Sequence, residues 1–475
     1  MTRILSVTSE CVPLVKTGGL ADVAGALPGA LAPLGHEMRT LLPGYPSVMK
    51  ALKKPKVVVE DDDLFGGPAR VLSTKLGGLA LFILDAPHLF DRAGTPYLDI
   101  NGSDFPDNPE RFAALSWVAM QIARDGADGW MPELVHAHDW QAGFAPYYLK
   151  TNGVDVPSVL TIHNIAFHGL APGDRLTSLR LDPADFGEQG FEYWGQIGAL
   201  KAGLQFATAL TTVSPTYARE LTTPEFGMGL DGVLRTRAAD LTGILNGIDL
   251  EVWDPKTDPA IVTYKTARGK GRAKARLRKE FGLPDADGPL AIVVSRLSHQ
   301  KGLDLLLEAL PAFVDRGGQL ALLGSGDKAM EAAFVKAAAQ HANVAVRIGY
   351  DEALSHRMMA GADAILVPSR FEPCGLTQLY GLRYGTIPLV AATGGLADTV
   401  IHASPMAMRS GVATGIQVSP LTAHALASAL MQLIDMFKDV DAWAMLQSNA
   451  MRQSVGWEAS AAEYAALYDR LTDSA

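Results

Sequence analysis

The sequence predicts an α/β protein with two parallel-sheet domains. Short β-branched runs alternate with longer segments of helical periodicity, this series occurs twice, and the hexapeptide Thr-Gly-Gly-Leu-Ala-Asp stands once in each half, at 17–22 and 393–398. Alternation of this kind is typical of βαβ units. The 475 residues, 48% of them hydrophobic and 19% charged, suffice for two sizeable cores. We therefore expect two Rossmann-like domains whose sheets face a deep cleft.

The expected strands are nearly continuous apolar runs, as in strands that are buried on both faces. In the first half they lie at 4–7, 79–84, 134–138, 158–163 and 210–213, with helices at 22–34 and 109–124. In the second half strands are expected at 290–294, 319–323, 343–348, 362–367 and 387–391, with helices at 302–315, 327–340, 351–360 and 374–384. Pro, Gly and Asp cluster near 249–289 and mark the break between the halves. Beyond residue 420 we expect helices at 421–438, 440–453 and 457–472.

Composition excludes several classes of protein. The net charge of −10 argues against binding to nucleic acid or acidic lipid, and the basic run 265–279 is expected to be the solvated face of a helix. With only Cys11 and Cys374, a disulfide framework is excluded and a cysteine-based zinc site nearly so. Neither a signal-peptide apolar core nor a membrane-spanning run is evident. We expect a reducing, cytoplasmic setting.

Two segments carry cations where a strand passes into a helix. In Lys16-Thr17-Gly18-Gly19-Leu20, glycine N–H groups and a mobile ammonium suit an anion, although an ordinary surface turn has the same composition. In Ser295–Gly302, Arg296 and Lys301 share one loop and together suit a diphosphate, Arg as a planar fork and Lys as a point charge. Two cations oppose the dipole of the helix that follows, which favours an anionic ligand.

A third segment, Arg370–Leu376, follows the expected strand 362–367. It places Glu372 before a proline near the start of a helix, where the carboxylate either interacts with the helix dipole or reaches a sugar hydroxyl or a cationic transition state; the residues leave both open. Cys374 is expected to be a small buried packing residue, because no dedicated histidine partner for a thiol is evident.

A fourth group consists of histidines at strand ends. Alternation puts His136 and His138 on one side of a strand, which indicates either a metal pair or, more simply, hydrogen-bonded histidines. His163 and Asn164 end the next strand. Trp140 beside Asp139 has the character of a carbohydrate platform, an apolar face with a polar neighbour.

Taken together, these motifs resemble bacterial glycogen synthases and plant starch synthases. Each motif is weak alone, but their order over about residues 1–470 is specific. The resemblance implies the GT-B fold, with an N-terminal Rossmann-like domain on the acceptor side (1–248), a C-terminal nucleotide-sugar-binding domain (249–455) and a C-terminal helix (456–475) that crosses back to the first domain. The matching segments are Lys16–Leu20, His136–Trp140, His163-Asn164, Leu245–Asp249, Ser295–Gly302, Glu372–Leu376 and Thr393–Leu396.

The same resemblance implies an activity. A glycogen (starch) synthase moves glucose from ADP-glucose to the non-reducing end of an α-1,4-glucan and retains the anomeric configuration. We expect a front-face route without metal or cofactor. The expected partners are ADP-glucose or ADP and a glycogen or malto-oligosaccharide acceptor, with no nucleic acid and no membrane.

Carried over residue by residue, the resemblance implies three groups of site residues. Glu372 and His163 would lie at the transferred glucose and, with Arg296 and Lys301 on the diphosphate, form the catalytic group. The acceptor side would include Asp139, Trp140 and Asp22. Tyr350 is a candidate to stack on the nucleobase. The donor group would comprise Lys16, Gly18, Gly19, Asn246, Arg296, Lys301, Tyr350, Cys374, Gly375, Leu376, Thr377, Thr393, Gly394 and Gly395.

One departure and three alternatives accompany this interpretation. Many members of the wider GT-B class carry a second glutamate eight residues after the first, where this chain has Tyr380. A nucleotide-sugar 2-epimerase would need acid and base carboxylates at the sugar and no polymer acceptor, whereas the aromatic residues between 160 and 200 favour an acceptor site. A non-catalytic polysaccharide-binding protein would have no use for Arg296 and Lys301. A glycogen phosphorylase would need a lysine that holds pyridoxal phosphate.

Overall fold

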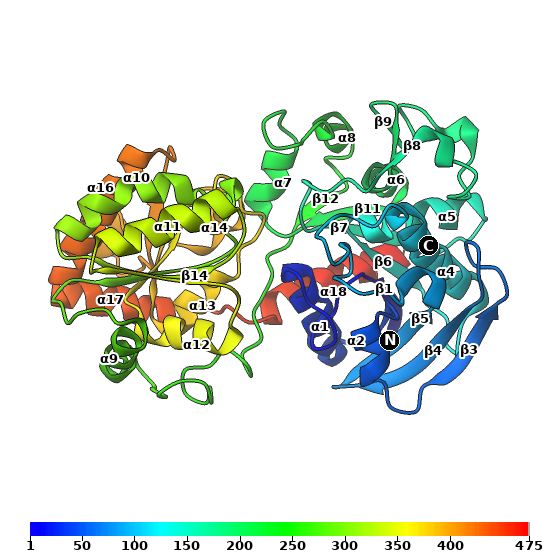
Figure 1. Ribbon diagram of the computed structural model, residues 1–475. Coiled ribbons are helices and arrows are strands. Elements are labelled where there is room, and N and C mark those ends of the chain that lie inside the picture. The colour runs from blue at the N-terminus through cyan, green and yellow to red at the C-terminus, as the bar shows by residue number, and fades with distance from the viewer. Residues whose placement is uncertain (474–475) are drawn as a thin grey trace. The chain divides into compact units, whose positions relative to one another are not determined.

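The computed structural model describes residues 1–473, which form two compact units (Figure 1). Unit 1 comprises residues 1–246 together with the described residues from Trp457 on, and unit 2 comprises Gly247–Gly456. Each unit contains a mainly parallel sheet with helices packed on it. This confirms the prediction of two α/β parts from the repeated alternation of strand and helix.

Unit 1 is organised around a nine-stranded sheet with the order β12-β11-β7-β6-β1-β2-β5-β4-β3. Only the β3–β4 and β4–β5 pairs at one edge are antiparallel. A separate antiparallel sheet has the order β8-β10-β9. The strands are β1 (Thr2–Val7), β2 (His36–Pro43), β3 (Lys56–Asp61), β4 (Ala69–Leu76), β5 (Leu79–Asp85), β6 (Leu134–His138), β7 (Ser158–Ile162), β8 (Leu170–Pro172), β9 (Glu192–Tyr193), β10 (Gln196–Gly198), β11 (Ala209–Thr212) and β12 (Leu241–Gly243).

The helices of unit 1 include the last helix of the chain. Helix α18 packs beside α1, as Figure 1 shows in red and dark blue, and its Ala461, Tyr464 and Tyr468 join Ile4 and Leu27 in one apolar cluster. The helices are α1 (Gly19–Leu31), α2 (Pro46–Ala51), α3 (Pro87–Phe90), α4 (Asn108–Asp125), α5 (Ala145–Thr151), α6 (Ala199–Phe206), α7 (Pro215–Leu221), α8 (Asp231–Thr236) and α18 (Glu458–Asp473).

Unit 2 has a six-stranded, wholly parallel sheet with the order β15-β14-β13-β16-β17-β18. The strands are β13 (Leu290–Val294), β14 (Gln319–Gly324), β15 (Val344–Ile348), β16 (Ala364–Val367), β17 (Ile387–Ala391) and β18 (Ile416–Val418). The helices are α9 (Lys270–Phe281), α10 (Leu303–Asp315), α11 (Lys328–Gln340), α12 (Glu352–Gly361), α13 (Thr377–Tyr384), α14 (Gly394–Thr399), α15 (Pro405–Arg409), α16 (Ala423–Lys438) and α17 (Val440–Met451).

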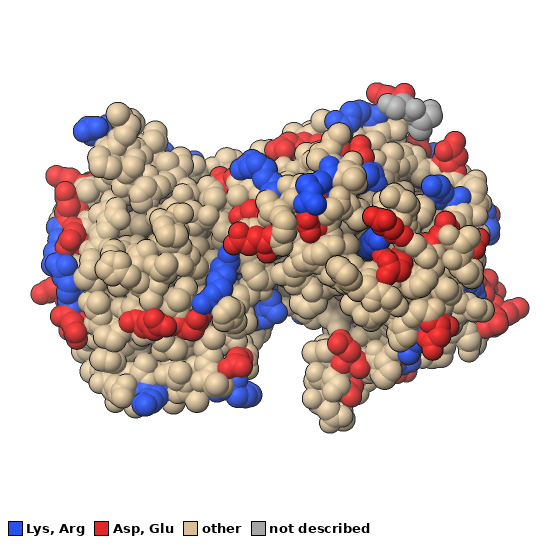
Figure 2. All heavy atoms as spheres, turned by 90° about the horizontal axis from the view of Figure 1, so that it is seen from above, with Lys and Arg blue, Asp and Glu red and all other residues tan. Residues whose placement is uncertain are grey.

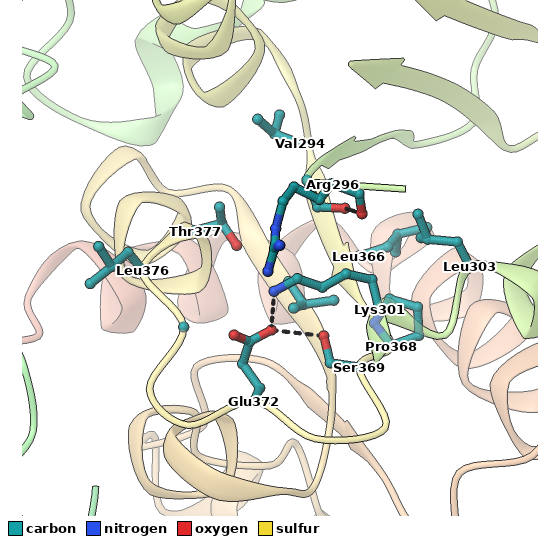
Figure 3. A pocket seen from close by; sticks show the side chains of 13 residues that line it. Val294, Arg296, Lys301, Leu303, Leu366, Pro368, Ser369, Glu372, Leu376 and Thr377 are labelled. Atoms are coloured by element: carbon teal, nitrogen blue, oxygen red, sulfur yellow. Dashed lines mark hydrogen bonds and ion pairs between the residues drawn. The ribbon is translucent and has the colours of Figure 1, made fainter. Parts of the chain in front are cut away.

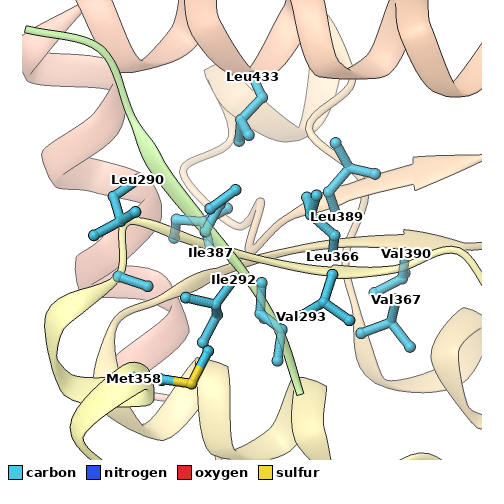
Figure 4. Packing of buried hydrophobic residues seen from close by; sticks show 14 of the residues in the cluster. Leu290, Ile292, Val293, Met358, Leu366, Val367, Ile387, Leu389, Val390 and Leu433 are labelled. Carbon is cyan, nitrogen blue, oxygen red and sulfur yellow. The ribbon is translucent and has the colours of Figure 1, made fainter. Parts of the chain in front are cut away.

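Helices cover both faces of the unit 2 sheet, which explains its uninterrupted apolar strands. Figure 4 shows Met358 of α12 on one face and Leu433 of α16 on the other, with the strands between them. Ile292 and Leu389, from two of those strands, are fully buried. Their burial, together with that of the rest of the cluster, supplies the main apolar stabilisation of the unit.

In both sheets the order in which successive strands are added reverses beside an internal strand. In unit 2, β14 and β15 follow β13 outward on one side of the sheet, and the next strand in the chain, β16, pairs with the other side of β13. In unit 1, β2 pairs with one side of β1 and β6 pairs with the other side. At such a switch point the loops that leave the two adjacent strands diverge and open a crevice where ligands bind. The switch points lie after β13 and β16 in unit 2, and after β1 and β6 in unit 1.

The structure departs from the sequence-based expectations in several elements. The helix expected over 374–384 begins only at Thr377, because Gly375 has φ +70° and this left-handed conformation interrupts a right-handed helix. The strands β2, β3 and β4 were not expected, since their charged residues obscure the apolar pattern. The second half gains the short edge strand β18.

Charges of both signs are interspersed over the face that Figure 2 presents. Among the residues that the structure describes, no helix is long and apolar enough to cross a membrane.

Lys270 is an unusual lysine, since it is buried at the first position of α9. Its ammonium donates to the Thr386 hydroxyl at 2.7 Å and to the Tyr384 and Met359 carbonyls at 3.0 and 3.2 Å. Desolvation by burial lowers the pKa of Lys270 to about 7. Above pH 7 the folded state therefore holds a neutral amine while the unfolded chain is still protonated.

This difference predicts a pH-dependent effect of Lys270→Met. Between pH 7 and about 10, the pKa of this lysine in the unfolded chain, the unfolded state binds one more proton than the folded state. The free energy of unfolding therefore rises with pH by up to about 1.4 kcal/mol per pH unit because of Lys270 alone. The variant lacks this gain, so its melting temperature should fall relative to wild type as pH rises from 7 to 10 in calorimetry. An offset that stays constant over this range would contradict the buried, neutral amine.

Candidate active site

Unit 2 contains a cavity of about 160 Å³ at its switch point, between the loops that follow β13 and β16. This volume is below the roughly 300–1,000 Å³ typical of whole-ligand pockets, so it suits one part of a larger ligand. Figure 3 shows the lining side chains. They come from Val294, Ser295, Arg296, Lys301, Leu303, Leu366, Val367, Pro368, Ser369, Glu372, Gly375, Leu376 and Thr377.

Glu372 and Lys301 form the polar centre of this cavity. The Lys301 ammonium donates to Glu372 Oε2 at 2.5 Å, and the buried Ser369 hydroxyl donates to the same oxygen at 2.8 Å (Figure 3). Both side chains of the ion pair are largely buried, which strengthens their attraction. Within residues 1–473, the second carboxylate oxygen of Glu372, Oε1, has no hydrogen-bond partner. In the same part of the chain, the exposed guanidinium of Arg296 forms neither a hydrogen bond nor an ion pair. The cavity thus presents one fixed carboxylate and one available cation.

Glycines in the turns around the cavity allow the loops to approach one another more closely than side chains would permit. Gly302 has φ +64°, and a Cβ there would lie 1.8 Å from the Pro368 carbonyl oxygen. In the second copy of the hexapeptide, the Gly395 N–H donates to the carbonyls of Glu372 and Pro373 at 3.1 Å. A Cβ on Gly394 would lie 2.0 Å from the Glu372 carbonyl oxygen. The second glycine turn therefore supports the loop that carries Glu372.

The remaining donor-side residues expected in unit 2 lie outside the cavity lining in the described structure. Cys374 is buried, as expected of a packing residue, and Thr393, Gly394 and Gly395 lie behind the Glu372 loop. Tyr350 is 77% exposed just after β15, and its hydroxyl contacts Glu352. Arg296, Lys301, Glu372, Gly375, Leu376 and Thr377 are brought together.

Tyr380 occupies the position of the absent second glutamate and has a packing role. Its ring stacks on Trp253 with a centroid separation of 3.7 Å, and Trp253 stacks on His356 at the same distance. The His356 ring and the Tyr384 hydroxyl both bond the buried carboxylate of Asp258. Tyr380 is buried in this stack and carries no carboxylate, so of these two positions only Glu372 supplies one.

In unit 1 the first glycine turn is bound by a carboxylate of the protein itself. Buried Glu10, just after β1, accepts the N–H groups of Thr17 and Gly18 and the hydroxyl of Thr17. The Tyr97 hydroxyl donates at 2.5 Å to Glu10 Oε1, the oxygen that also accepts the Thr17 hydroxyl. Lys16, the cation expected to bind a donor anion, pairs with Asp22 at 2.8 Å. The turn has the anion-binding geometry that its sequence indicates, and in this structure the anion is Glu10.

The strand-end histidines form a hydrogen-bonded chain. His138 Nδ1 lies 3.0 Å from His163 Nε2, and His138 Nε2 lies 3.1 Å from the Ser6 hydroxyl. His136 bonds Thr161 at 2.6 Å and the Tyr468 hydroxyl of α18 at 2.8 Å. All four ring nitrogens of His136 and His138 are thus used, which agrees with the hydrogen-bonded alternative. No group of three or more His, Cys, Asp or Glu side chains among residues 1–473 is arranged to hold a metal ion.

Burial fixes the protonation of this cluster. Desolvation lowers the pKa of His163 and of His136 to about 3, so both imidazoles are neutral at physiological pH. The pKa of Asp139 rises to about 7, because desolvation outweighs the hydrogen bonds that it accepts from the His163 and Asn164 backbone. Asp139 also has φ +53°, an uncommon conformation for a non-glycine residue. Asp139 therefore orients the segment that carries His163.

The other unit 1 candidates are partly enclosed. Trp140 makes an edge contact with Phe112, at a centroid separation of 5.0 Å, and packs against the Gly169 backbone, so only part of its ring is accessible. Asn246 is 7% exposed, and its Oδ1 is buried without a hydrogen-bond partner in the described chain. An unpartnered buried amide oxygen is costly, which makes Asn246 a candidate for contact with a ligand hydroxyl.

Several polar residues at these sites were not found from the sequence. Glu10 and Tyr97 hold the first glycine turn, and Ser369 holds Glu372. Ser369 stands only three residues before Glu372 and could have been noticed in the same segment. Glu10 and Tyr97 are 87 residues apart, and no local spacing connects them.

Comparison with known proteins begins with two family models. Residues 3–236 match the starch synthase catalytic domain, and residues 274–445 match the glycosyl transferases group 1. The two matched ranges lie within units 1 and 2, respectively.

Curated relatives match over essentially the whole chain. The glycogen synthase of Paracoccus denitrificans is 62% identical over 472 residues, covering 99% of this chain and 100% of that protein. The glycogen synthase of Jannaschia sp. is 61% identical over 468 residues, covering 98% and 99%.

Solved structures lead to the same assignment of fold and family as these relatives. The catalytic domain of starch synthase IV from Arabidopsis thaliana, bound to ADP and acarbose, superposes with a TM-score of 0.88 at 30% identity and 99% coverage of both chains. Sucrose-phosphate synthase from Thermosynechococcus elongatus, at 19% identity and full coverage of both chains, has a TM-score of 0.62 and shares the GT-B fold. The two parallel-sheet units are therefore those of a GT-B enzyme, and the chain belongs to the glycogen synthase family of glycosyltransferases.

Proposed function

We propose that the enzyme transfers glucose from ADP-glucose to the non-reducing end of an α-1,4-glucan, with retention and without a metal ion. The observation that carries the proposal is the cavity at the unit 2 switch point, with Arg296, Lys301 and Glu372 in its lining. The whole-length relatives named glycogen synthase support this substrate class over the 2-epimerase alternative. The related starch synthase bound to ADP and acarbose supports an adenine nucleotide and a glucan as ligands.

Arg296 and Lys301 would stabilise the leaving diphosphate. Negative charge grows on the leaving oxygen as the glycosidic bond breaks, and preorganised cations stabilise it most in the transition state. Arg296 is available to form a bidentate contact with phosphate, because no residue in the described chain neutralises it. Lys301, 2.5 Å from Glu372, would bridge the carboxylate and a phosphate oxygen.

Glu372 would stabilise positive charge on the glucosyl carbon. That carbon becomes oxocarbenium-like as the leaving group departs. Lys301 and Ser369 hold Oε2, which leaves Oε1 for the sugar. Tyr380 supplies no second carboxylate, so a double displacement of the glycosidase type lacks its partner within this loop. In a front-face route the leaving phosphate takes the proton of the attacking 4-hydroxyl.

Unit 1 would contribute neutral groups at the sugar and acceptor. The low pKa of His163, about 3, keeps its ring a hydrogen-bonding imidazole rather than a cation, which would otherwise repel the developing oxocarbenium charge. Asp139 and Trp140 would lie toward the acceptor, and Asn246 would bind a glucose hydroxyl through its unpartnered oxygen.

Replacing Glu372 by Gln tests the electrostatic role. The amide keeps the shape and removes the charge, so turnover should fall roughly 10²–10³-fold while the Kd for ADP changes little, as steady-state kinetics and calorimetry will measure. Glu331→Gln is the matched control, because Glu331 is likewise buried and paired with a lysine, Lys328, outside the cavity. Near-wild-type turnover, or a glucosyl ester on Glu372 detected by mass spectrometry, would refute the role.

Replacing Arg296 by Ala tests transition-state stabilisation of the diphosphate. We expect kcat to fall roughly 10²–10³-fold, because the cation acts on charge that develops during the reaction. Arg316→Ala, which removes an exposed arginine elsewhere in the same unit, should leave kcat unchanged. If Arg296→Ala raised only KM, the side chain would bind ground state and transition state equally.

Transfer of radiolabelled glucose into glycogen tests the proposed function and the donor. The wild-type enzyme should incorporate label from ADP-glucose with a higher kcat/KM than from UDP-glucose. A preference for UDP-glucose would overturn the donor assignment, and absence of incorporation from either would overturn the transferase proposal.

A further inference from the structure

A clamp of polar contacts outside the cavity lining connects the two cavity loops. We propose that Arg370 and Asp304 are positioning residues, whose ion pair sets the placement of Lys301 against Glu372. This inference rests on the proposed function, since Lys301 and Glu372 are the groups that it positions. Neither Arg370 nor Asp304 belongs to the cavity lining, so both would act through other residues.

The Arg370 guanidinium contacts both the loop after β13 and the first turn of α10, which follows that loop. Nη1 and Nη2 donate to the two Asp304 carboxylate oxygens at 2.7 and 2.6 Å, a bidentate pair. Nη1 also donates to the His299 carbonyl at 2.7 Å. These acceptors lie on either side of Lys301, at positions −2 and +3. The Arg370 side chain thus holds the His299 backbone on one side of Lys301 and the Asp304 side chain on the other.

The backbones of the two loops are also joined directly. The Arg370 N–H donates to the Gln300 carbonyl at 2.8 Å, and the Gln300 side-chain amide donates to the Phe371 carbonyl at 3.2 Å. Arg370 and Phe371 immediately precede Glu372, and Gln300 immediately precedes Lys301. Every contact of the clamp therefore lies within three residues of one member of the Lys301–Glu372 pair.

The neighbouring glycine explains why the loops need such a clamp. Gly302 must approach the Pro368 carbonyl without a side chain, and its left-handed conformation turns the chain into α10. A glycine junction is conformationally free in the absence of other contacts. Asp304, in the first turn of α10, removes that freedom by binding Arg370. The guanidinium also lowers the pKa of Asp304, so the pair remains charged.

The clamp contributes more to placement than to global stability. The Arg370 and Asp304 side chains are 27% and 39% exposed, and partly exposed ion pairs stabilise a fold only weakly. A displacement of about 1 Å of a catalytic group, by contrast, can cost on the order of 10²-fold in rate. Loss of the clamp should therefore lower turnover in an enzyme that remains folded.

A double-mutant cycle on kcat tests this role. Arg370→Ala and Asp304→Asn should each lower kcat roughly 10-fold or more with little change in KM for the glucan, and the double variant should be no worse than the worse single variant. Arg370→Lys, which keeps the charge without the fork, should restore only part of the activity. The matched controls are Arg357→Ala and Glu280→Gln, which break another bidentate pair in unit 2, with both side chains 23% exposed, and should leave kcat within about twofold.

Hydrogen exchange gives a readout that does not depend on catalysis. In Arg370→Ala, backbone amides of 295–302 and 368–376 should exchange roughly 10-fold faster than in wild type, with no change in Arg357→Ala. Unchanged exchange together with control-level kcat would overturn the clamp. A wild-type enzyme without glucosyl transfer would overturn the proposed function instead, and the exchange measurement would then decide the clamp alone.

Discussion

The reversal of strand order in each parallel sheet is the constraint on which the sites depend. Loops that leave β13 and β16 proceed to helices on opposite faces of the sheet, so they separate at its edge and leave room between them. The cavity of unit 2 lies in that space, and Lys301 comes from one loop while Glu372 comes from the other. The same arrangement in unit 1 places Glu10 after β1 and Asp139 after β6.

Close approach across such a space requires backbone without side chains. Gly302 meets Pro368, and Gly394 and Gly395 meet the Glu372–Cys374 segment at distances that a Cβ would forbid. Hydrogen-bonding groups then fix the position of the loop segments that the glycines bring close together. Ser369 and Lys301 hold one oxygen of Glu372, and the Thr17 and Gly18 amides hold Glu10. In both units a carboxylate is immobilised by hydrogen bonds before any ligand binds.

The sequence predicted the architecture well where strands are buried on both faces. β13 and β17 have the expected bounds, because Leu290–Val294 and Ile387–Ala391 are continuous apolar runs between turns. β2 was missed because Glu37 and Arg39 alternate with buried residues on one side of the sheet. The family resemblance implies that Arg296, Lys301 and Glu372 belong to one site, and the structure places all three in the lining of one cavity. The sequence did not reveal that Glu10 occupies the first glycine turn or that Arg370 binds Asp304, because these pairings depend on loop geometry rather than on local spacing.

The helix α18 gives unit 1 a distinctive order of assembly during synthesis. Unit 1 is made of two separate stretches of chain, and its final piece follows the whole of unit 2. Until that piece leaves the ribosome, the surface formed by Ile4, Val23 and Leu27 lacks Tyr464 and Tyr468, and His136 has Thr161 but not Tyr468 as a hydrogen-bond partner. At typical elongation rates the interval between residues 246 and 457 is roughly 10–40 s. Throughout that time the nascent first unit carries an uncovered apolar surface, whereas unit 2 is continuous in sequence and has no such dependence on the end of the chain.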